Sequence, residues 1–63
     1  MDKILGIYLT IDHSTGQKRV YVVSLFDVTS LTGNGDALLS LQNDQIYLNN
    51  PNSDTRRFQV FLL

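Results

Sequence analysis

The stretch ILGIYLTIDHSTGQKRVYVVSLF, residues 4–26, decides the fold of this chain. Residues 4–12 and 17–26 are dominated by β-branched and aromatic residues, which favour strands. The polar link between them ends in Gly16, which can adopt the positive φ that a tight turn needs. Two strand-forming runs joined by a short polar link predict a β-hairpin.

The next segment, residues 27–36, is read as a break in regular structure. Gly33, Asn34 and Gly35 form a turn signal, so we expect a loop here. An alternative is a single helical turn over residues 28–31 capped by Asp27.

Residues 37–42 are ambiguous because their helix propensity is good but the segment is short. Isolated helices of this length are marginal in water. Asn43 and Asp44 follow at once and lead into a strand signal at residues 45–48. We therefore expect a second hairpin, with a short helix over 37–42 as the alternative.

The remainder predicts one last strand. Residues 49–55 are polar and contain Pro51, which argues against regular structure. Residues 58–63 are mostly apolar and are expected to pair within a sheet. The sum is an all-β domain over residues 1–63, with five strands from two hairpins plus a C-terminal strand. Five short strands suit a small barrel or sandwich, SH3-like or OB-like, or a curled meander.

Size and composition limit how such a domain can be stabilised. A 63-residue domain is marginal without disulfides, a metal or oligomerisation. The chain has no cysteine and one histidine, which excludes disulfides and thiolate or multi-histidine metal sites. Charged residues make up 17% of the chain against a typical quarter, which favours a surface covered by a partner.

Nothing in the sequence indicates a targeting signal or a membrane span. No apolar run approaches the roughly 20 residues that a membrane helix needs. The expectation is a cytoplasmic protein without membrane contact, and its length is compatible with a viral, mobile-element or cellular origin.

The residues with catalytic potential are better explained as turn residues. Asp12, His13 and Ser14 are adjacent, whereas a catalytic triad draws its members from separate parts of a fold. All six acidic residues are Asp, and without Glu the usual calcium loop cannot form. Gly33 and Gly35 lack the rest of a nucleotide-binding motif. We therefore expect no enzyme, and no catalytic, cofactor or metal site.

The preferred functional hypothesis is a protein-interaction module, expected to be homo-oligomeric, with an inhibitor, adaptor or assembly role. The first, second and last strands are apolar on both faces, although a sheet with one wet face should alternate. A second chain, or a strongly curled barrel, would cover the extra face. Aromatic residues dominate interface energetics. The predicted partner-binding residues are therefore Tyr8, Tyr21, Tyr47 and Phe61.

The alternative hypothesis is a nucleic-acid-binding barrel. Two basic pairs, Lys18 with Arg19 and Arg56 with Arg57, each precede or begin a predicted strand. If the last strand runs the same way as the second, the four charges meet at one end, with tyrosines as stacking platforms. The net charge of −1 favours ordinary solvated charges instead.

Overall fold

The computed structural model describes residues 3–63, which form six strands and no helix. None of these residues therefore belongs to a helix that could cross a membrane. The strands are β1 (Gly6–Asp12), β2 (Lys18–Val23), β3 (Val28–Gly33), β4 (Leu38–Gln42), β5 (Gln45–Asn49) and β6 (Phe58–Leu62).

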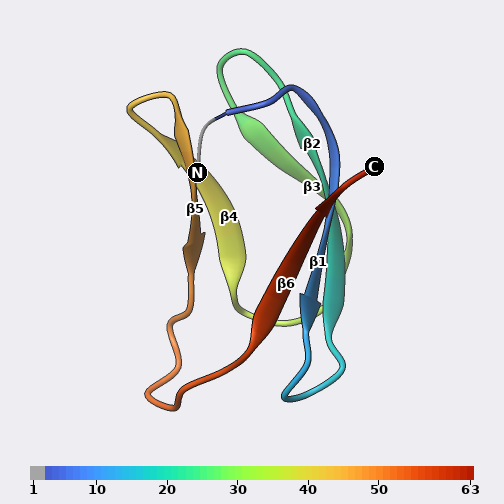
Figure 1. Cartoon of the computed structure of the whole chain (residues 1–63), viewed down its shortest axis with the longest axis vertical. Coiled ribbons are helices and arrows are strands. Elements are labelled where there is room, and N and C mark those ends of the chain that lie inside the picture. The colour runs from blue at the N-terminus through green and yellow to red at the C-terminus, as the bar shows by residue number, and fades with distance from the viewer. Residues whose placement is uncertain (1–2) are drawn as a thin grey trace.

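A four-stranded antiparallel sheet in the order β3-β2-β1-β6 is the larger of two sheets (Figure 1). The predicted first hairpin is confirmed, because β1 and β2 pair from Gly6 opposite Val23 to Ile11 opposite Lys18. The predicted last strand is also confirmed, and it pairs with β1 on the other side. Since β1 is antiparallel to both neighbours, β2 and β6 run in the same direction.

The second sheet is the β4–β5 hairpin, so residues 38–42 form a strand and the helical alternative is wrong. Asn43 and Asp44 connect the two strands with φ of 51° and 61°. Two consecutive left-handed residues are typical of the type I′ turn, whose twist matches that of the flanking strands. The hairpin register therefore follows from the Asn-Asp step.

The prediction of a loop or helical turn for residues 28–31 is wrong, because this segment forms most of β3. Ser24 N–H donates to the Asp27 carbonyl at 3.0 Å, so the chain turns earlier than the glycines suggested. β3 then pairs with β2, with a register shift between Val20 and Tyr21 that leaves Leu31 as a bulge. Residues 3–63 consequently form six strands rather than the expected five.

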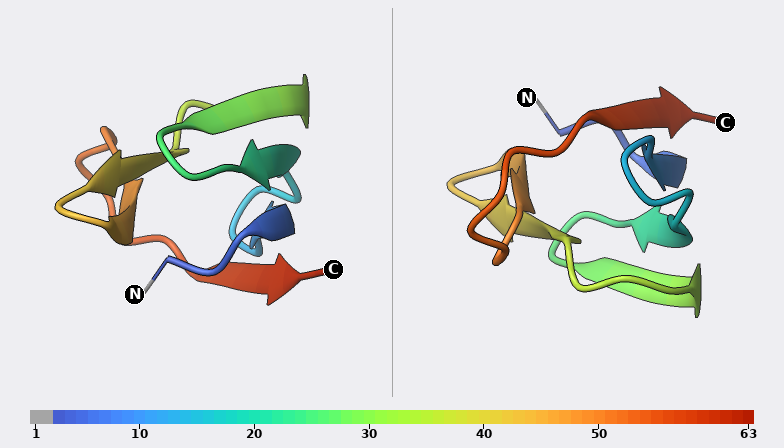
Figure 2. Two further views of the ribbon diagram at one scale, coloured as in Figure 1. Left: turned by 90° about the horizontal axis from the view of Figure 1, so that it is seen from above. Right: turned by 90° about the horizontal axis from the view of Figure 1, so that it is seen from below.

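The two sheets lie as two layers, with the β4–β5 hairpin against one face of the four-stranded sheet (Figure 2). The predicted all-β class is confirmed for residues 3–63. No closed barrel is found among these residues, so the predicted barrel or sandwich form is not confirmed. The core lies between the layers and consists of Tyr8, Tyr21, Val23, Leu39 and Ile46.

Candidate functional site

The face of the four-stranded sheet that points away from β4–β5 is apolar across three adjacent strands. Side chains alternate between the two faces of a strand, and Tyr8, Thr10 and Asp12 of β1 are buried on the core side. The opposite side carries what we call the outer face: Ile7, Leu9 and Ile11 of β1, Val20 and Val22 of β2, and Phe61 of β6.

The strand register makes the outer face one continuous patch. Leu9 lies opposite Val20 on one side and opposite Phe61 on the other. Ile7 lies opposite Val22. No element formed by residues 3–63 covers this face, because the only other sheet lies on the core side (Figure 2). Ile7 is 44% exposed and Phe61 is 37% exposed.

The balance between buried and exposed apolar side chains is unusual for a folded domain. Among residues 3–63, five hydrophobic residues are buried in the core, whereas eleven large hydrophobic side chains are exposed. Single exposed apolar residues are ordinary, but contiguous apolar patches mark interaction sites. Of these eleven exposed side chains, Ile7 and Phe61 belong to the contiguous outer face.

A second apolar feature is the tip of the β2–β3 hairpin. The turn is closed by hydrogen bonds between Ser24 and Asp27, which leaves Leu25 and Phe26 at its end. Phe26 is 89% exposed. Sequence reasoning placed this pair inside a strand and missed its exposure, because the early turn at Ser24 carries no glycine or proline.

The four predicted partner-binding residues are divided between core and surface. Tyr8 and Tyr21 are 2% and 1% exposed, so both side chains belong to the core. Tyr47 is exposed on β5, where it lines a shallow hollow with Leu38 and Leu48. Phe61 lies on the outer face. The aliphatic residues of the outer face were overlooked as site residues, although the apolar alternation on both sides of the strands was their signal.

The two basic pairs do meet at one end of the sheet, because β2 and β6 both begin beside the C-terminal end of β1. Two of the four side chains, those of Arg19 and Arg56, are held by other residues, however. The Arg19 guanidinium donates to Ser30 Oγ at 2.9 Å and to the Gly35 carbonyl at 2.7 Å. Arg56 forms ion pairs, whereas Lys18 and Arg57 are exposed at this end. No salt bridge joins Lys18 or Arg57 to a carboxylate within residues 3–63.

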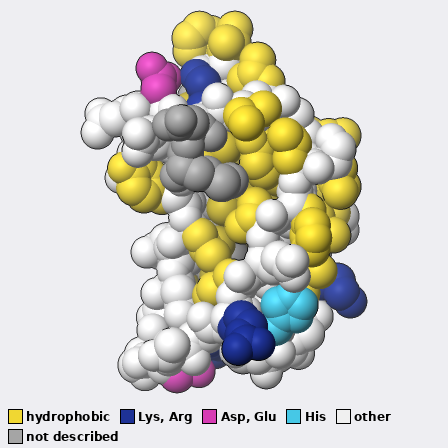
Figure 3. All heavy atoms as spheres, viewed as in Figure 1, with side chains coloured by type: hydrophobic (Ala, Val, Ile, Leu, Met, Phe, Trp, Pro, Cys, Tyr) yellow, Lys and Arg dark blue, Asp and Glu magenta, His cyan; other side chains and the backbone are white. Residues whose placement is uncertain are grey.

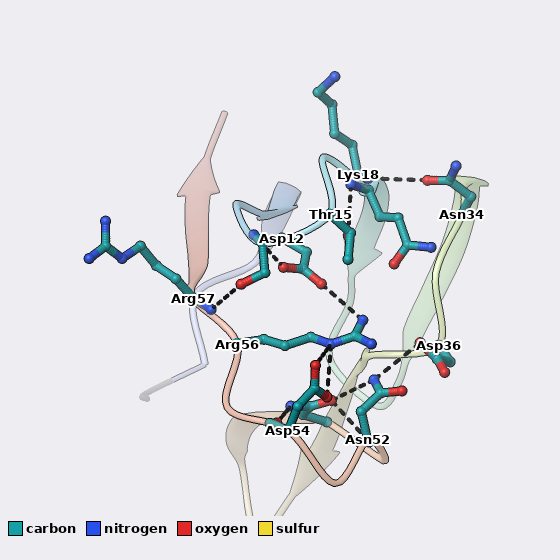
Figure 4. Close-up of polar contacts among 12 residues, drawn as sticks. Asp12, Thr15, Lys18, Asn34, Asp36, Asn52, Asp54, Arg56 and Arg57 are labelled. Atoms are coloured by element: carbon teal, nitrogen blue, oxygen red, sulfur yellow. Dashed lines mark hydrogen bonds and ion pairs between the residues drawn. The ribbon is translucent and has the colours of Figure 1, made fainter.

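Asp12 is the centre of a polar cluster beside the first turn (Figure 4). Its carboxylate accepts a hydrogen bond from Ser14 N–H at 2.9 Å. It also forms an ion pair with Arg56 Nη1 at 3.2 Å. Arg56 Nε also pairs with Asp54 at 3.2 Å. The cluster ties the β1–β2 turn to the segment that leads into β6.

The electrostatics of this cluster favour the ionised carboxylate. Burial by itself raises the pKa of Asp12, but hydrogen bonds from Ser14 and Thr15 and the nearby Arg56 guanidinium outweigh it. The net result is a pKa of Asp12 below its ordinary value of 3.8. The hollow lined by Asp12 and Arg19 has a volume of about 10 Å³, which holds about one water molecule. The ion pairs and hydrogen bonds of this cluster link the first turn to the segment before β6.

His13 follows Asp12 in the first turn and is exposed. Its Nε2 atom lies 2.8 Å from Gln59 Oε1 on β6. Within residues 3–63, no group of three or more His, Cys, Asp or Glu side chains is placed to hold a metal ion. Comparison with known proteins adds no assignment, since no family model, no curated protein and no solved structure matches the chain.

Proposed function

We propose that this chain is a small, non-catalytic protein-interaction module that binds a partner protein through the outer face. The observation that carries the proposal is the continuous apolar patch over β1, β2 and β6, which nothing in residues 3–63 covers. Removing apolar surface from water stabilises a complex by about 25 cal/mol per Å² before the costs of association. The patch gives a partner that driving force.

The size of the face fits a small specific interface. Strands of five to seven residues, four abreast, span roughly 20 Å in each direction at about 3.3 Å per residue and 4.8 Å between strands. That is roughly 400 Å² before the relief of the side chains is counted. Because a standard interface takes about 800 Å² per partner, a partner must also contact surface beyond the four strands.

The rim of the outer face is polar, which supports the same function. Thr29 and Thr32 border the patch on β3, and Lys18 and Gln59 lie opposite Ile11 on its two sides. An apolar centre within a polar rim is the usual anatomy of a protein interface. A partner surface with apolar side chains at its centre and hydrogen-bonding groups around them would fit this face.

The second candidate function is nucleic-acid binding at the basic end, and the convergence of the two basic pairs supports it. Within residues 3–63, Lys18, Arg19 and Arg57 have no carboxylate partner. The Arg19 guanidinium is held by Ser30 and Gly35, which leaves Lys18 and Arg57 for phosphate contacts. Two phosphate contacts give weak affinity and a shallow salt dependence, since each contact contributes about 0.9 to the slope of log affinity against log salt. The outer face is therefore the stronger candidate.

The experiment is comparative capture from a cell extract, with nuclease added to one half of each sample. The baits are the wild-type chain, Val22→Lys in the outer face, and Ser53→Lys in the exposed β5–β6 loop as a control of equal charge change. We expect one protein to bind the wild type and Ser53→Lys and to be lost with Val22→Lys. Thermal unfolding of each bait verifies that it is folded.

Two results would contradict the proposal. One is a bound protein that Val22→Lys retains in full, which would place the interaction elsewhere on the molecule. The other is binding that nuclease abolishes for all three baits, which would favour the basic end and nucleic acid.

A further inference from the structure

We propose that the free edge of β6 pairs with β6 of a second copy of this chain. The two strands would run antiparallel about a two-fold axis at Val60, joining two four-stranded sheets into one continuous sheet. This contact uses the edge of the sheet and not the outer face, so it does not depend on the function proposed above.

The backbone of β6 has a defined set of groups directed away from β1. The Leu63 N–H donates to the Ile7 carbonyl, and the His13 N–H donates to the Arg57 carbonyl, both at 2.8 Å. In an antiparallel pair, both backbone groups of every second residue face the same neighbour. The odd-numbered residues of β6 therefore bond to β1, and the N–H and C=O groups of Phe58, Val60 and Leu62 point outward.

The two edges of the sheet differ in how they are protected. β3, at one edge, is rich in Thr and Ser and contains the bulge at Leu31, and bulges obstruct strand addition. β6, at the other edge, has the sequence FQVFL, with no charge, no proline and no register shift against β1. Figure 3 views the molecule from the β6 side and shows hydrophobic side chains gathered along it. Such an edge is a template for pairing with another strand.

A second copy fits this edge because β6 is complementary to itself. With the axis at Val60, Phe58 lies opposite Leu62 of the other copy, and Val60 lies opposite its own equivalent. No charged residue of β6 meets another, because the strand has none. The two Arg57 side chains would be six residues apart along the pair, about 20 Å at 3.3 Å per residue. That separation exceeds the screening length of about 8 Å at physiological salt.

The pairing would also stabilise a domain whose own core is small. Five buried hydrophobic residues among residues 3–63 are few for a chain that has no cysteine, and oligomerisation commonly stabilises domains of this size. A closed two-fold contact uses the same edge on both copies and leaves no further β6 edge free. It would also place the outer faces of the two copies side by side on one sheet.

Solution mass tests the pairing. We expect the wild type to have twice the 7.1 kDa chain mass by light scattering at micromolar concentration, and Val60→Pro to have the mass of one chain. Proline at Val60 removes an N–H that points away from β1, so no hydrogen bond to β1 is lost. Proline is tolerated on edge strands. Val60→Thr keeps the N–H and is expected to remain a dimer. If Val60→Pro fails to fold, a synthetic chain N-methylated at Val60 removes the same donor and keeps the side chain.

Cysteine cross-linking tests the register, since the chain has no native cysteine. Hydrogen-bonded antiparallel pairs have Cα atoms about 5.5 Å apart, within the range of about 4.4–6.8 Å that a disulfide spans. Val60→Cys should therefore form a covalent dimer on oxidation. Leu62→Cys should not, because its equivalents would lie four residues apart along the pair.

The outcomes separate this inference from the proposed function. A wild type that stays monomeric at all concentrations, or a Val60→Pro chain that still dimerises, would overturn the β6 pairing. A dimer lost with Val22→Lys but kept with Val60→Pro would place self-association on the outer face and also overturn it. A dimer that survives Val22→Lys and is lost with Val60→Pro would support it, whatever the capture experiment shows.

Discussion

The hydroxyl of Tyr21 accepts a hydrogen bond from the backbone N–H of Leu39 at 3.3 Å, and this contact joins the two sheets. The same hydroxyl donates to the carbonyl of Ala37 at 3.4 Å. Tyr21 is buried in the core. Its hydroxyl finds its hydrogen-bond partners in the segment that leads into β4 and in β4 itself. The position of β4–β5 against the larger sheet thus depends on a polar contact as well as on apolar packing.

Replacing Tyr21 with Phe tests this link. The change leaves the buried Leu39 N–H without its partner, and an unsatisfied buried donor costs about 1–3 kcal/mol. Both bonds are longer than usual, since N–H···O bonds measure about 2.7–3.2 Å and O–H···O bonds about 2.5–3.0 Å. We therefore expect the free energy of unfolding to fall by about 1–2 kcal/mol. Tyr47→Phe, on the exposed face of β5, should change it by less than about 0.5 kcal/mol. Equal losses in urea unfolding would show that the Tyr21 hydroxyl is not a structural link.

Acid should weaken the cluster around Asp12. Its pKa lies below 3.8 in the folded chain and near 3.9 in an unfolded one. The folded state therefore resists protonation, and the stabilisation is present above about pH 4 and lost as the pH falls through the lowered pKa. We expect Asp12→Asn to be less stable than the wild type at pH 7 and the difference to shrink below pH 4.

Asp44→Asn is the matched control for that measurement. The Asp44 carboxylate pairs with Lys3 but is 86% exposed, and exposed ion pairs contribute little. Asn also tolerates the positive φ found at Asp44. In thermal unfolding between pH 2 and 7, Asp44→Asn should have a smaller effect than Asp12→Asn above about pH 4. A constant difference between wild type and Asp12→Asn across this range would contradict the proposed role of the lowered pKa.

Gly16, in the first turn, and Gly33, at the end of β3, should respond differently to alanine. A Cβ at Gly33 would lie 2.3 Å from the Lys18 carbonyl oxygen, so the β2–β3 pair must separate to accept it. A Cβ at Gly16 would meet no atom within 4 Å, although its φ is +80°. We expect Gly16→Ala to cost about 1–2 kcal/mol, the usual cost of a left-handed alanine. Gly33→Ala should cost clearly more, and chemical denaturation of both variants would show a reversed order if β3 does not pair as described.

The hairpin tip should contribute little to stability. Phe26 contacts mostly solvent, and we expect Phe26→Ser to change the free energy of unfolding by less than about 0.5 kcal/mol. Val23, three residues earlier, is fully buried, and Val23→Ala should cost roughly 2–3 kcal/mol through lost burial and a cavity. If Phe26→Ser proves as damaging as Val23→Ala in the same assay, the tip must be packed in solution.

Local sequence signals were sufficient for the hairpins. The run from Ile4 to Phe26 predicted β1 and β2, and the Asn43-Asp44 step predicted the second turn. Both hairpins are specified by residues that are close in the chain. Their φ preferences and the alternation of their side chains do not require contacts with distant segments. The prediction for residues 28–31 was wrong because the chain already turns between Ser24 and Asp27, where two apolar residues stand at the tip, and not at the glycines at 33 and 35. Threonine and valine then extend as a strand because β2 offers a partner edge.

The sequence by itself determined an all-β chain without cysteine chemistry, with apolar residues on both faces of its main strands. Only the tertiary structure decided which face is covered. The β4–β5 hairpin lies against Tyr8 and Tyr21, which places these tyrosines in the core and leaves Ile7, Leu9 and Val22 on the outer face. Alternation divides residues into two sets but does not say which set a distant segment will cover. That choice is made by long-range packing, such as the contact of Tyr21 with Leu39.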